Sequence, residues 1–597
     1  MCRRGGRNTQ SNYMKMGIYP LPPLLYQQIR EKKDLLKLYP VLGEIICPQN
    51  YTQKFDMLLH LEEIQLCVDL QQFNLHDACL QHAGQFLSLE LPGLAEGRPS
   101  LLVGDRALLT LPGSMEAEDK LTVYEGCIHE VHKDSIRLMF HPDFHAKYNG
   151  ESYDISFEFN RSGLVASTLC FSLCKTPNNK LSTIWGDQQP VFTRCLDVAV
   201  LFPPLSMDLK PPVFTLHEWF NPHLNQRQKD AVLRILENQS HLSPYVVFGP
   251  PGTGKTLTLV ETVVQITHTM PHARVLVCAP SNSAADLIAM KLIKTNGFDG
   301  SDIVRLNAFQ RKEEVSMGAI MIPDLSSQHS IEYITALYGL YISSLAISIM
   351  EGLETYCKVG QDLSMLVRQR LVVTTCTNAG LLYRMQLPES HFSHILIDEA
   401  GQATEPETLI PILLSLSAQV VLAGDHKQLG PIVRSFVARN SGLQLSLMER
   451  IMTRHCYQPD PDHYAETGNY NPYLVTKLID NYRSVPDLVE MPSRMFYDNQ
   501  LVCHYTGGEE FQKLSQSKIF PTPGFPIVFH GVQVSAAIPL LLFLFPLCED
   551  YTNSESMILW NGCRGAAFID HGTMIQAHFD FACNLRPFLT WKQTRCC

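Results

Sequence analysis

The spacing of apolar residues divides the chain into three kinds of segment. Between residues 51 and 73, leucine, isoleucine and valine recur at steps of three and four, which predicts a long amphipathic helix. Residues 98–175 contain short apolar runs that alternate with polar positions and end at turn residues, as in a small antiparallel barrel. From residue 224 to 432, strand-like and helix-like segments alternate, which predicts a parallel α/β domain.

Composition limits the kind of partner that the chain can bind. Of its 597 residues, 45% are hydrophobic and 18% are charged, and the formal net charge is −11. A protein with this charge has no overall attraction for nucleic acid. A nucleic-acid partner would therefore have to be bound in a local groove.

The cysteines and histidines do not form a metal-binding pattern. None of the 18 cysteines belongs to a CxxC pair, and Cys170 and Cys174 lack a matching histidine pair. The predicted barrel contains His129, His132, His141 and His145. These histidines have no evident carboxylate or thiolate support, so a metal cluster is the less favoured interpretation.

Two features predict a protein of the cytoplasm without a membrane anchor. The first residues are polar and basic and do not resemble a signal peptide, and free thiols suit a reducing compartment. The longest apolar stretch, residues 536–548, contains two prolines. It is also shorter than the roughly 20 residues that cross a bilayer.

The segment richest in chemistry is a GxxxxGK[ST] phosphate-binding loop between a strand-like and a helix-like run. It consists of Gly249, Pro250, Pro251, Gly252, Thr253, Gly254, Lys255 and Thr256. Backbone N–H groups in such a loop bind a triphosphate. We predict that Lys255 reaches the β- and γ-phosphates of ATP and that the Thr256 hydroxyl binds Mg²⁺. A glycine-rich turn that binds nothing is the alternative, and the flanking strand and helix argue against it.

Two more polar loops follow apolar runs. Asp398 and Glu399 come directly after residues 395–397. Asp398 is predicted to hold Mg²⁺, and Glu399 to orient and deprotonate the attacking water. A turn with acidic residues at a strand end is the alternative. The run at 420–424 leads to Gln428, which is predicted to approach the γ-phosphate.

Four motifs occur in the order GPPGTGKT, DEAGQATEPE, GDHKQLGPIV and NYRSVP. With this set the chain resembles the Upf-one-like superfamily 1 helicases. Within them it is most similar to the Armitage and Moloney-leukaemia-virus-ten RNA helicases, and above all to their germline-type branch. The resemblance covers residues 1–530. A transporter ATPase or a kinase would not account for all four motifs in this order.

The resemblance implies an α/β fold. A RecA-like parallel-sheet motor domain would carry a small β-barrel insertion and a helical insertion, and an incomplete second RecA-like domain would follow. The implied segments are an irregular, proline-dotted N-terminal segment at 1–50, stalk helices at 51–97, the β-barrel insertion at 98–175, a linker and stalk return at 176–223, the first RecA-like ATP-binding domain at 224–299 and 366–470, the helical insertion at 300–365, the start of the second RecA-like domain at 471–532 and an atypical tail at 533–597.

The resemblance also implies roles for single residues. Gln228 would read the adenine of ATP, and Tyr482 would stack on it. Arg483 would stabilise charge on the γ-phosphoryl group from across the cleft, as arginine fingers do. The implied contacts to the nucleic-acid backbone are Ser281, Asn282 and Thr375.

At the level of function, the resemblance implies an ATP-dependent 5′-to-3′ RNA helicase that acts in RNA silencing, with a role in small-RNA and transposon control in germ cells. Its partners would be single-stranded RNA and Argonaute- or Piwi-type silencing proteins, and it would act as a monomer. Phosphate contacts are common to both nucleic acids, so the sequence does not separate RNA from DNA.

The family pattern is lost after residue 532. The TxxxxQG-like, EFQG-like and final Thr-Arg motifs of a second motor domain do not follow. We therefore expect an alternatively spliced or frame-shifted terminus, with ATP binding retained, hydrolysis weak or absent and unwinding lost. The alternative to a helicase is thus a non-catalytic truncated isoform that binds RNA or protein partners without unwinding.

Overall fold

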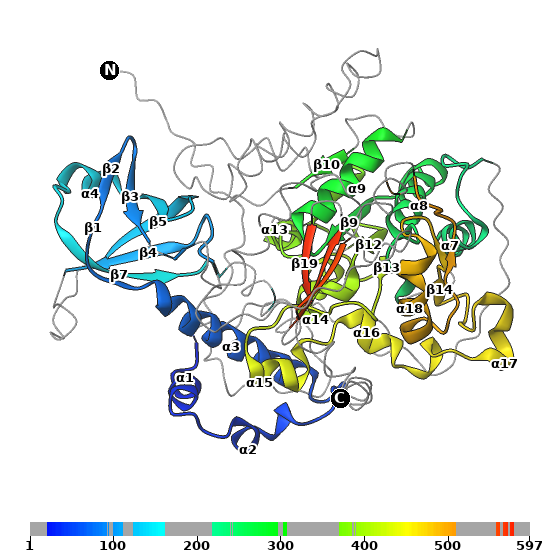
Figure 1. Ribbon diagram of the computed structural model, residues 1–597, viewed down its shortest axis with the longest axis horizontal. Helices are drawn as coiled ribbons and strands as arrows, with labels where there is room; N and C mark the ends of the chain where they lie inside the picture. Colours follow the sequence, from blue (N-terminus) through cyan, green and yellow to red (C-terminus); the bar gives the residue numbers. More distant parts are fainter. Residues whose placement is uncertain are drawn as a thin grey trace, which may run out of the picture. The chain divides into compact units, whose positions relative to one another are not determined.

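Most of the chain is described by a computed structural model (Figure 1). The described residues are 21–91, 93–94, 100–111, 123–161, 167, 218–238, 240, 243–295, 303–306, 369–384, 387–388, 390–508 and 511, and the backbone of 557–561, 565–570 and 573–577. Two compact units are present, Met1–Phe248 with Lys255–Lys477, and Gly249–Gly254 with Leu478–Cys597. The predicted linker and stalk return at 176–223 lies outside the described residues up to residue 217. The helical insertion beyond residue 306 and the apolar run in the tail also lie outside them.

The first unit starts with short helices where an irregular segment was predicted. They are α1 (Pro23–Arg30), α2 (Leu35–Leu38) and the 3-10 turn η1 (Pro40–Leu42). Pro22 is the N-cap of α1 and Pro23 its first residue. The prediction was wrong because proline at the start of a helix removes no hydrogen bond that the helix needs.

The predicted long helix is confirmed as α3 (Tyr51–Leu70), which continues into the 3-10 turn η2 (Gln71–Phe73). It is not amphipathic, however, because Lys54, His60 and Glu63 are buried together with its leucines. The Lys54 Nζ donates to the Leu42 carbonyl at 3.1 Å. The helix therefore packs on several sides, and hydrogen bonding offsets the burial of its polar groups.

A seven-stranded antiparallel sheet follows α3, in the order β1-β7-β4-β5-β6-β3-β2. Its strands are β1 (Leu75–Cys79), β2 (Gln81–Ala83), β3 (Phe86–Glu90), β4 (Arg106–Thr110), β5 (Tyr124–Val131), β6 (Ser135–Met139) and β7 (Ser152–Glu158), with the helix α4 (Pro142–Lys147) between β6 and β7. Only Leu80 separates the edge strands β1 and β2 in the chain. The two edges of the sheet are thus adjacent, as in a barrel.

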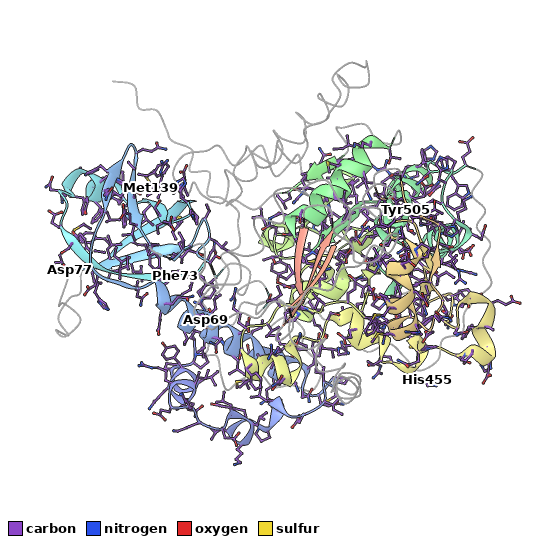
Figure 2. The ribbon with its side chains drawn as sticks, viewed as in Figure 1. Asp69, Phe73, Asp77, Met139, His455 and Tyr505 are labelled. Carbon is purple, nitrogen blue, oxygen red and sulfur yellow. The ribbon has the colours of Figure 1, made fainter. Side chains whose placement is uncertain are left out.

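The predicted alternation of apolar and polar positions is confirmed in this sheet. Every second residue of β6 and β7 is buried, and these side chains share one core with Leu70 and Phe73. Figure 2 labels Phe73 where the helical segment enters the barrel. The end of α3 is thus part of the barrel core.

The predicted start of the barrel at residue 98 was wrong, because three strands of the sheet precede that residue and the first of them, β1, begins at Leu75. A two-residue turn of Gly84 and Gln85 joins β2 to β3, and Gly84 has a φ of +67°. Glycine adopts such angles without strain. Gly84 between two short runs was the available signal for this hairpin.

The α/β part contains a parallel sheet in the order β10-β11-β9-β12-β13-β8-β14. Its strands are β8 (Tyr245–Phe248), β9 (Val275–Ala279), β10 (Ile303–Arg305), β11 (Leu371–Thr375), β12 (His394–Ile397), β13 (Gln419–Gly424) and β14 (Val475–Lys477). Each residue of these strands is buried. Parallel strands covered on both faces have this pattern, so the predicted α/β fold is confirmed.

Both edges of this sheet differ from the prediction. Strand β10 lies in the range expected to form a helical insertion, yet it pairs with β11. Strand β14 lies beyond residue 471, where a second domain was expected to begin, yet it pairs with β8. Each strand has three residues, which is too short for an apolar period to be recognised.

Helices connect the strands of the first unit. They are α7 (Gln226–Glu237), α8 (Lys255–Thr269), α9 (Asn282–Lys294), α13 (Ala379–Arg384), α14 (Glu405–Ile412), α15 (Phe436–Ala438), α16 (Leu447–Met452) and α17 (Pro461–Tyr464), with the short helical turns η5 (Ala400–Gln402), η6 (Arg439–Leu443), η7 (His455–Tyr457) and η8 (Ala465–Thr467). Helix α8 packs between α7 and α9.

The second unit contains a parallel strand–helix–strand element of β15 (Asp480–Asn481), α18 (Pro486–Phe496) and β16 (Val502–Cys503). Further along the chain, β17 (Met557–Asn561), β18 (Gly565–Asp570) and β19 (Thr573–Ala577) pair as an antiparallel sheet.

Candidate nucleotide site

The phosphate-binding loop connects the end of β8 to the first residue of α8. Gly252 and Gly254 have φ values of +77° and +83°, which are favourable for glycine and strained for other residues. The Thr253 hydroxyl donates to the Pro250 carbonyl at 2.7 Å. Lys255 is the first residue of α8 and is buried. The sequence therefore folds here as a tight turn that leads into the N-terminus of a helix.

The two residues predicted to bind Mg²⁺ lie together in the first unit. The Thr256 Oγ1 donates to the Asp398 Oδ2 at 2.9 Å. Asp398 follows β12 and is 2% exposed. Burial and the neighbouring Glu399 raise the pKa of Asp398 to about 6, against the opposing effects of Lys255 and Thr256. One hydroxyl and one carboxylate fit Mg²⁺, which takes oxygen ligands and keeps several waters.

Glu399 is held in an unusual backbone conformation beside Asp398. Its φ is +51°, in the left-handed region that few non-glycine residues adopt. Its N–H donates to the Asp398 Oδ1 at 3.0 Å, and its Oε2 accepts from the Gln402 Nε2 at 3.3 Å. The turn thus fixes both carboxylates by local hydrogen bonds.

Gln428 is positioned by Asp425, a buried residue that the sequence did not single out. The Gln428 Nε2 donates to the Asp425 Oδ2 at 2.8 Å, and the Lys427 N–H donates to the other carboxylate oxygen at 2.9 Å. The loops after β12 and β13 also touch, because a Cβ on Gly401 would lie 2.7 Å from the Asp425 carbonyl oxygen. Asp425 therefore connects the two loops.

Gln228 has a structural role in the first turn of α7. Its N–H donates to the Asn225 Oδ1 at 2.9 Å, and its Oε1 accepts from the Asn225 N–H at 3.0 Å. This reciprocal pair is a capping box, which stabilises the start of a helix. Adenine recognition by Gln228 stays a prediction.

The three residues predicted to contact nucleic acid lie at the carboxyl ends of the neighbouring strands β9 and β11. Ser281 is exposed and caps α9 by accepting from the Ala284 N–H at 3.2 Å. The Asn282 Oδ1 accepts from the Arg305 Nη2 at 3.0 Å. Thr375 is buried, and its hydroxyl accepts from the Asn378 N–H at 3.2 Å.

Arg305 is a supporting residue that sequence reasoning missed. Its Nε lies 3.0 Å from the Asp286 Oδ1 in an ion pair that is almost fully buried. It lies on β10, in the range expected to be a helical insertion, so its link to Asn282 had no sequence signal. Buried charges of this kind are retained when they are paired and hydrogen-bonded.

In the second unit, the phosphate loop contacts the NYRS motif. The Asn481 Nδ2 donates to the Pro251 carbonyl at 2.7 Å, and the Tyr482 N–H donates to the Gly252 carbonyl at 3.0 Å. The sequence suggested roles for Tyr482 and Arg483 but none for Asn481.

The Tyr482 ring, predicted to stack on adenine, is stacked on His504. The ring centroids are 5.0 Å apart and the planes are inclined by 17°. The His504 Nε2 lies 2.7 Å from the Asp480 Oδ1, which orients the imidazole. Tyr482 remains 45% exposed, so part of its surface is accessible.

A glycine-rich loop before a helix, with a paired hydroxyl and carboxylate at the carboxyl edge of a parallel sheet, defines a P-loop nucleotide-binding α/β domain. Three family models match the chain: an AAA domain over residues 223–336 and 348–436, a helicase MOV-10 beta-barrel domain over 69–157 and a helicase MOV-10 helical domain over 22–72. Together these matches support the MOV-10 and Armitage group of superfamily 1 helicases as the family of this chain.

Curated relatives agree with this assignment. The chain is 35% identical to RNA helicase Mov10l1 of Homo sapiens over 87% of its length and 44% of that protein. It is 34% identical to the probable RNA helicase armi of Drosophila melanogaster over 82% of its length and 41% of that protein. It is 36% identical to the putative helicase mov-10-B.1 of Danio rerio over 81% of its length and 43% of that protein. The chain thus spans less than half the length of these relatives.

A solved arterivirus nonstructural protein 10 helicase in complex with DNA is also similar, at 16% identity over 47% of this chain and 44% of that one. Its TM-score is 0.22. Within the described ranges, no helix is long and apolar enough to cross a membrane. The same ranges contain no group of three histidine, cysteine or acidic side chains that could hold a metal ion.

Proposed function

We propose that this chain is an ATP-dependent helicase that moves 5′ to 3′ along single-stranded RNA. The observation that carries the proposal is the contact of the Thr256 hydroxyl with the Asp398 carboxylate at 2.9 Å, next to Lys255 at the start of α8. Relatives named RNA helicases support RNA as the nucleic acid.

Thr256 and Asp398 would hold Mg²⁺, and Lys255 would bind the β- and γ-phosphates. When bound, Mg²⁺ neutralises charge on these phosphates. A divalent cation beside Asp398 would also favour its ionised form, against the burial that raises its pKa to about 6. The buried Asp398 carboxylate is thus suited to a site that holds a cation.

Three residues would act on the γ-phosphoryl group. Glu399 would orient and deprotonate the attacking water, and its left-handed backbone turns it away from the extended path of β12. Gln428, fixed by Asp425, would contact the γ-phosphate. Arg483 would stabilise the transferring charge. The two residues before Arg483 bond the phosphate loop directly.

Gln228 and Tyr482 would recognise the adenine, the first by hydrogen bonding and the second by stacking. Ser281, Asn282 and Thr375 would contact the nucleic-acid backbone. None of these three side chains is charged, so binding would rely on hydrogen bonds to phosphate and sugar and be largely independent of sequence.

We further propose a cytoplasmic monomer that acts in RNA silencing, in small-RNA and transposon control in germ cells, with Argonaute- or Piwi-type proteins as partners. This part of the proposal rests on the family resemblance alone. Affinity capture from germ-cell extract with a Lys255→Ala chain beside the parent would test whether such partners bind, and whether they need the nucleotide site.

The central test measures ATP hydrolysis by the purified chain with and without single-stranded RNA. As a helicase, the chain should show RNA-stimulated turnover that Lys255→Ala abolishes and that Lys294→Ala, at an exposed lysine near the end of α9, leaves unchanged. The loss of the family pattern after residue 532 predicts the opposite outcome, in which ATP is bound but hydrolysis is weak or absent. ATP binding without turnover would contradict the helicase assignment. It would favour a chain that binds RNA or protein partners without unwinding. A DNA arm of the same assay distinguishes the two nucleic acids.

A further inference from the structure

Asn481 is bonded at both ends of its side-chain amide. The Nδ2 donates to the Pro251 carbonyl at 2.7 Å, and the Oδ1 accepts from the N–H groups of Arg483 at 3.0 Å and Ser484 at 2.8 Å. The residue is 3% exposed, and its own carbonyl accepts from the His504 N–H at 2.8 Å. An asparagine amide both donates and accepts, whereas an aspartate carboxylate of the same shape only accepts.

The backbone adds a second link between the same two segments. The Tyr482 N–H donates to the Gly252 carbonyl at 3.0 Å, one residue beyond the carbonyl that Asn481 uses. A Cβ on Gly252 would lie 2.6 Å from the Arg483 Cβ, closer than real Cβ atoms approach. Gly252 also has a φ of +77°. The phosphate loop and the NYRS motif are therefore in direct contact, and glycine at 252 makes this contact possible.

The N–H groups and the carbonyl oxygens of the phosphate loop have different partners. In phosphate loops the N–H groups serve the anion, so the carbonyl oxygens can accept from other donors. Here Asn481 and Tyr482 supply those donors. Arg483 follows them directly, and its own N–H is held by Asn481. The backbone of Arg483 is thus fixed relative to the loop by hydrogen bonds that involve no nucleotide.

We infer that Asn481 is a positioning residue that sets the approach of Arg483 to the γ-phosphoryl group through the backbone of the phosphate loop. The inference rests on the proposed function and deepens it, because it assigns the geometry of the arginine to a side chain that contacts no substrate. Misplacement of a catalytic group by about 1 Å can lower turnover by about a hundredfold. Binding by the loop N–H groups would persist.

Two variants separate the donor from the rest of the side chain. Asn481→Asp retains both acceptor bonds and loses the bond to the Pro251 carbonyl. Asn481→Leu loses all three bonds without adding charge. Asn499→Asp is the matched control, because Asn499 is exposed in the same unit. We expect both Asn481 variants to lower RNA-stimulated kcat by about ten- to a hundredfold. The dissociation constant of a fluorescent ATP analogue should change by less than about threefold.

The measured kcat and nucleotide affinity together test the role of Asn481. Unchanged kcat in both Asn481 variants would overturn the inference. So would a loss of nucleotide affinity equal to the loss of kcat/KM, since that pattern indicates a role in binding or folding. A parent chain that binds no nucleotide, or binds it without turnover, would instead refute the proposed function.

Hydrogen exchange then tests the contact independently. Without nucleotide, peptides covering residues 249–257 should exchange faster in Asn481→Asp than in the parent and in Asn499→Asp. Equal exchange in all three would refute the contact itself, whatever the activity of the parent.

Discussion

At position 401 the DEAG motif has no room for a side chain. A Cβ on Gly401 would lie 2.7 Å from the carbonyl oxygen of Asp425, and one on Gly424 would lie 3.0 Å from the Gly401 nitrogen. These two obstacles are backbone atoms, which cannot rotate away as a side chain can. A Cβ on Gly424 would also meet the Met448 Sδ at 2.9 Å. The two glycines therefore let the loops after β12 and β13 touch, which keeps the Asp398 turn next to the segment that carries Gln428.

Gly401→Ala should consequently weaken both the fold and the site. Overpacking of a tight contact lowers stability by about 1–3 kcal/mol. Urea unfolding of the full chain should show this loss, and RNA-stimulated turnover should fall with it. Gly43→Ala is the control, because its Cβ would meet only the Pro40 carbonyl oxygen at 3.6 Å. Equal stability of the two variants would show that the loops separate without cost.

Single residues differed in how far the sequence could assign them. Lys255, Thr256 and Asp398 belong to motifs whose chemistry depends on local spacing, and the structure brings Thr256 and Asp398 together. Asn481 and Asp425 gave no such signal. Their importance comes from contacts with chain segments that only the fold brings close, and a short motif does not encode these contacts.

The N-terminal end of helix α3 contacts a buried ion pair within the first unit. The Arg450 Nε and Nη2 donate to the two carboxylate oxygens of Glu405 at 2.7 and 2.6 Å, and the Tyr51 hydroxyl donates to the same carboxylate. Glu405 is 0% exposed. Further along α3, the Glu62 carboxylate accepts from the Arg434 and Ser435 N–H groups. The helix thus contacts segments that follow both the Asp398 and the Gln428 loops.

Removal of one partner from the buried pair should be severe. Arg450→Met leaves the Glu405 carboxylate buried and unpaired by a cation, so it should lower the free energy of unfolding by about 3–5 kcal/mol. Replacing Glu405 as well, in an Arg450→Met, Glu405→Gln chain, should restore part of that loss, as measured by a double-mutant cycle. Arg439→Met, at a half-buried arginine that packs on Phe436, serves as the control. Additive effects in the cycle would contradict the coupling.

Whole elements were predictable where their apolar period or continuous apolar run was long enough to recognise. Helix α3, the strands β4 to β7 and the buried parallel strands all follow such a pattern. The first hairpin of the barrel and the edge strands β10 and β14 did not, because runs of three residues are compatible with almost any structure. The prolines at the start of α1 led to a wrong prediction for a different reason, since proline both starts helices and breaks them.

At the scale of the molecule, the barrel is formed by one contiguous segment of the chain. Its seven strands are contiguous in sequence from Leu75 to Glu158, and its core cluster draws in Leu70 and Phe73 from the helical segment. The MOV-10 beta-barrel family model begins at residue 69 and so includes both. Arg161, just after β7, pairs with Glu63 of α3. The folding unit should therefore comprise the barrel and the last turns of α3.

A fragment of residues 62–161 should accordingly unfold cooperatively on its own, as followed by circular dichroism in urea. Phe73 is 5% exposed in the barrel core, so Phe73→Ala should lower the stability of this fragment by about 3–5 kcal/mol. In the full chain the same substitution should leave ATP-analogue affinity unchanged, because Phe73 belongs to the barrel core and not to the nucleotide site.

A fragment that starts at residue 75 lacks Leu70 and Phe73 and should be less stable than the fragment of residues 62–161. Equal stability of the two fragments would place the boundary at β1 and make α3 dispensable for the barrel.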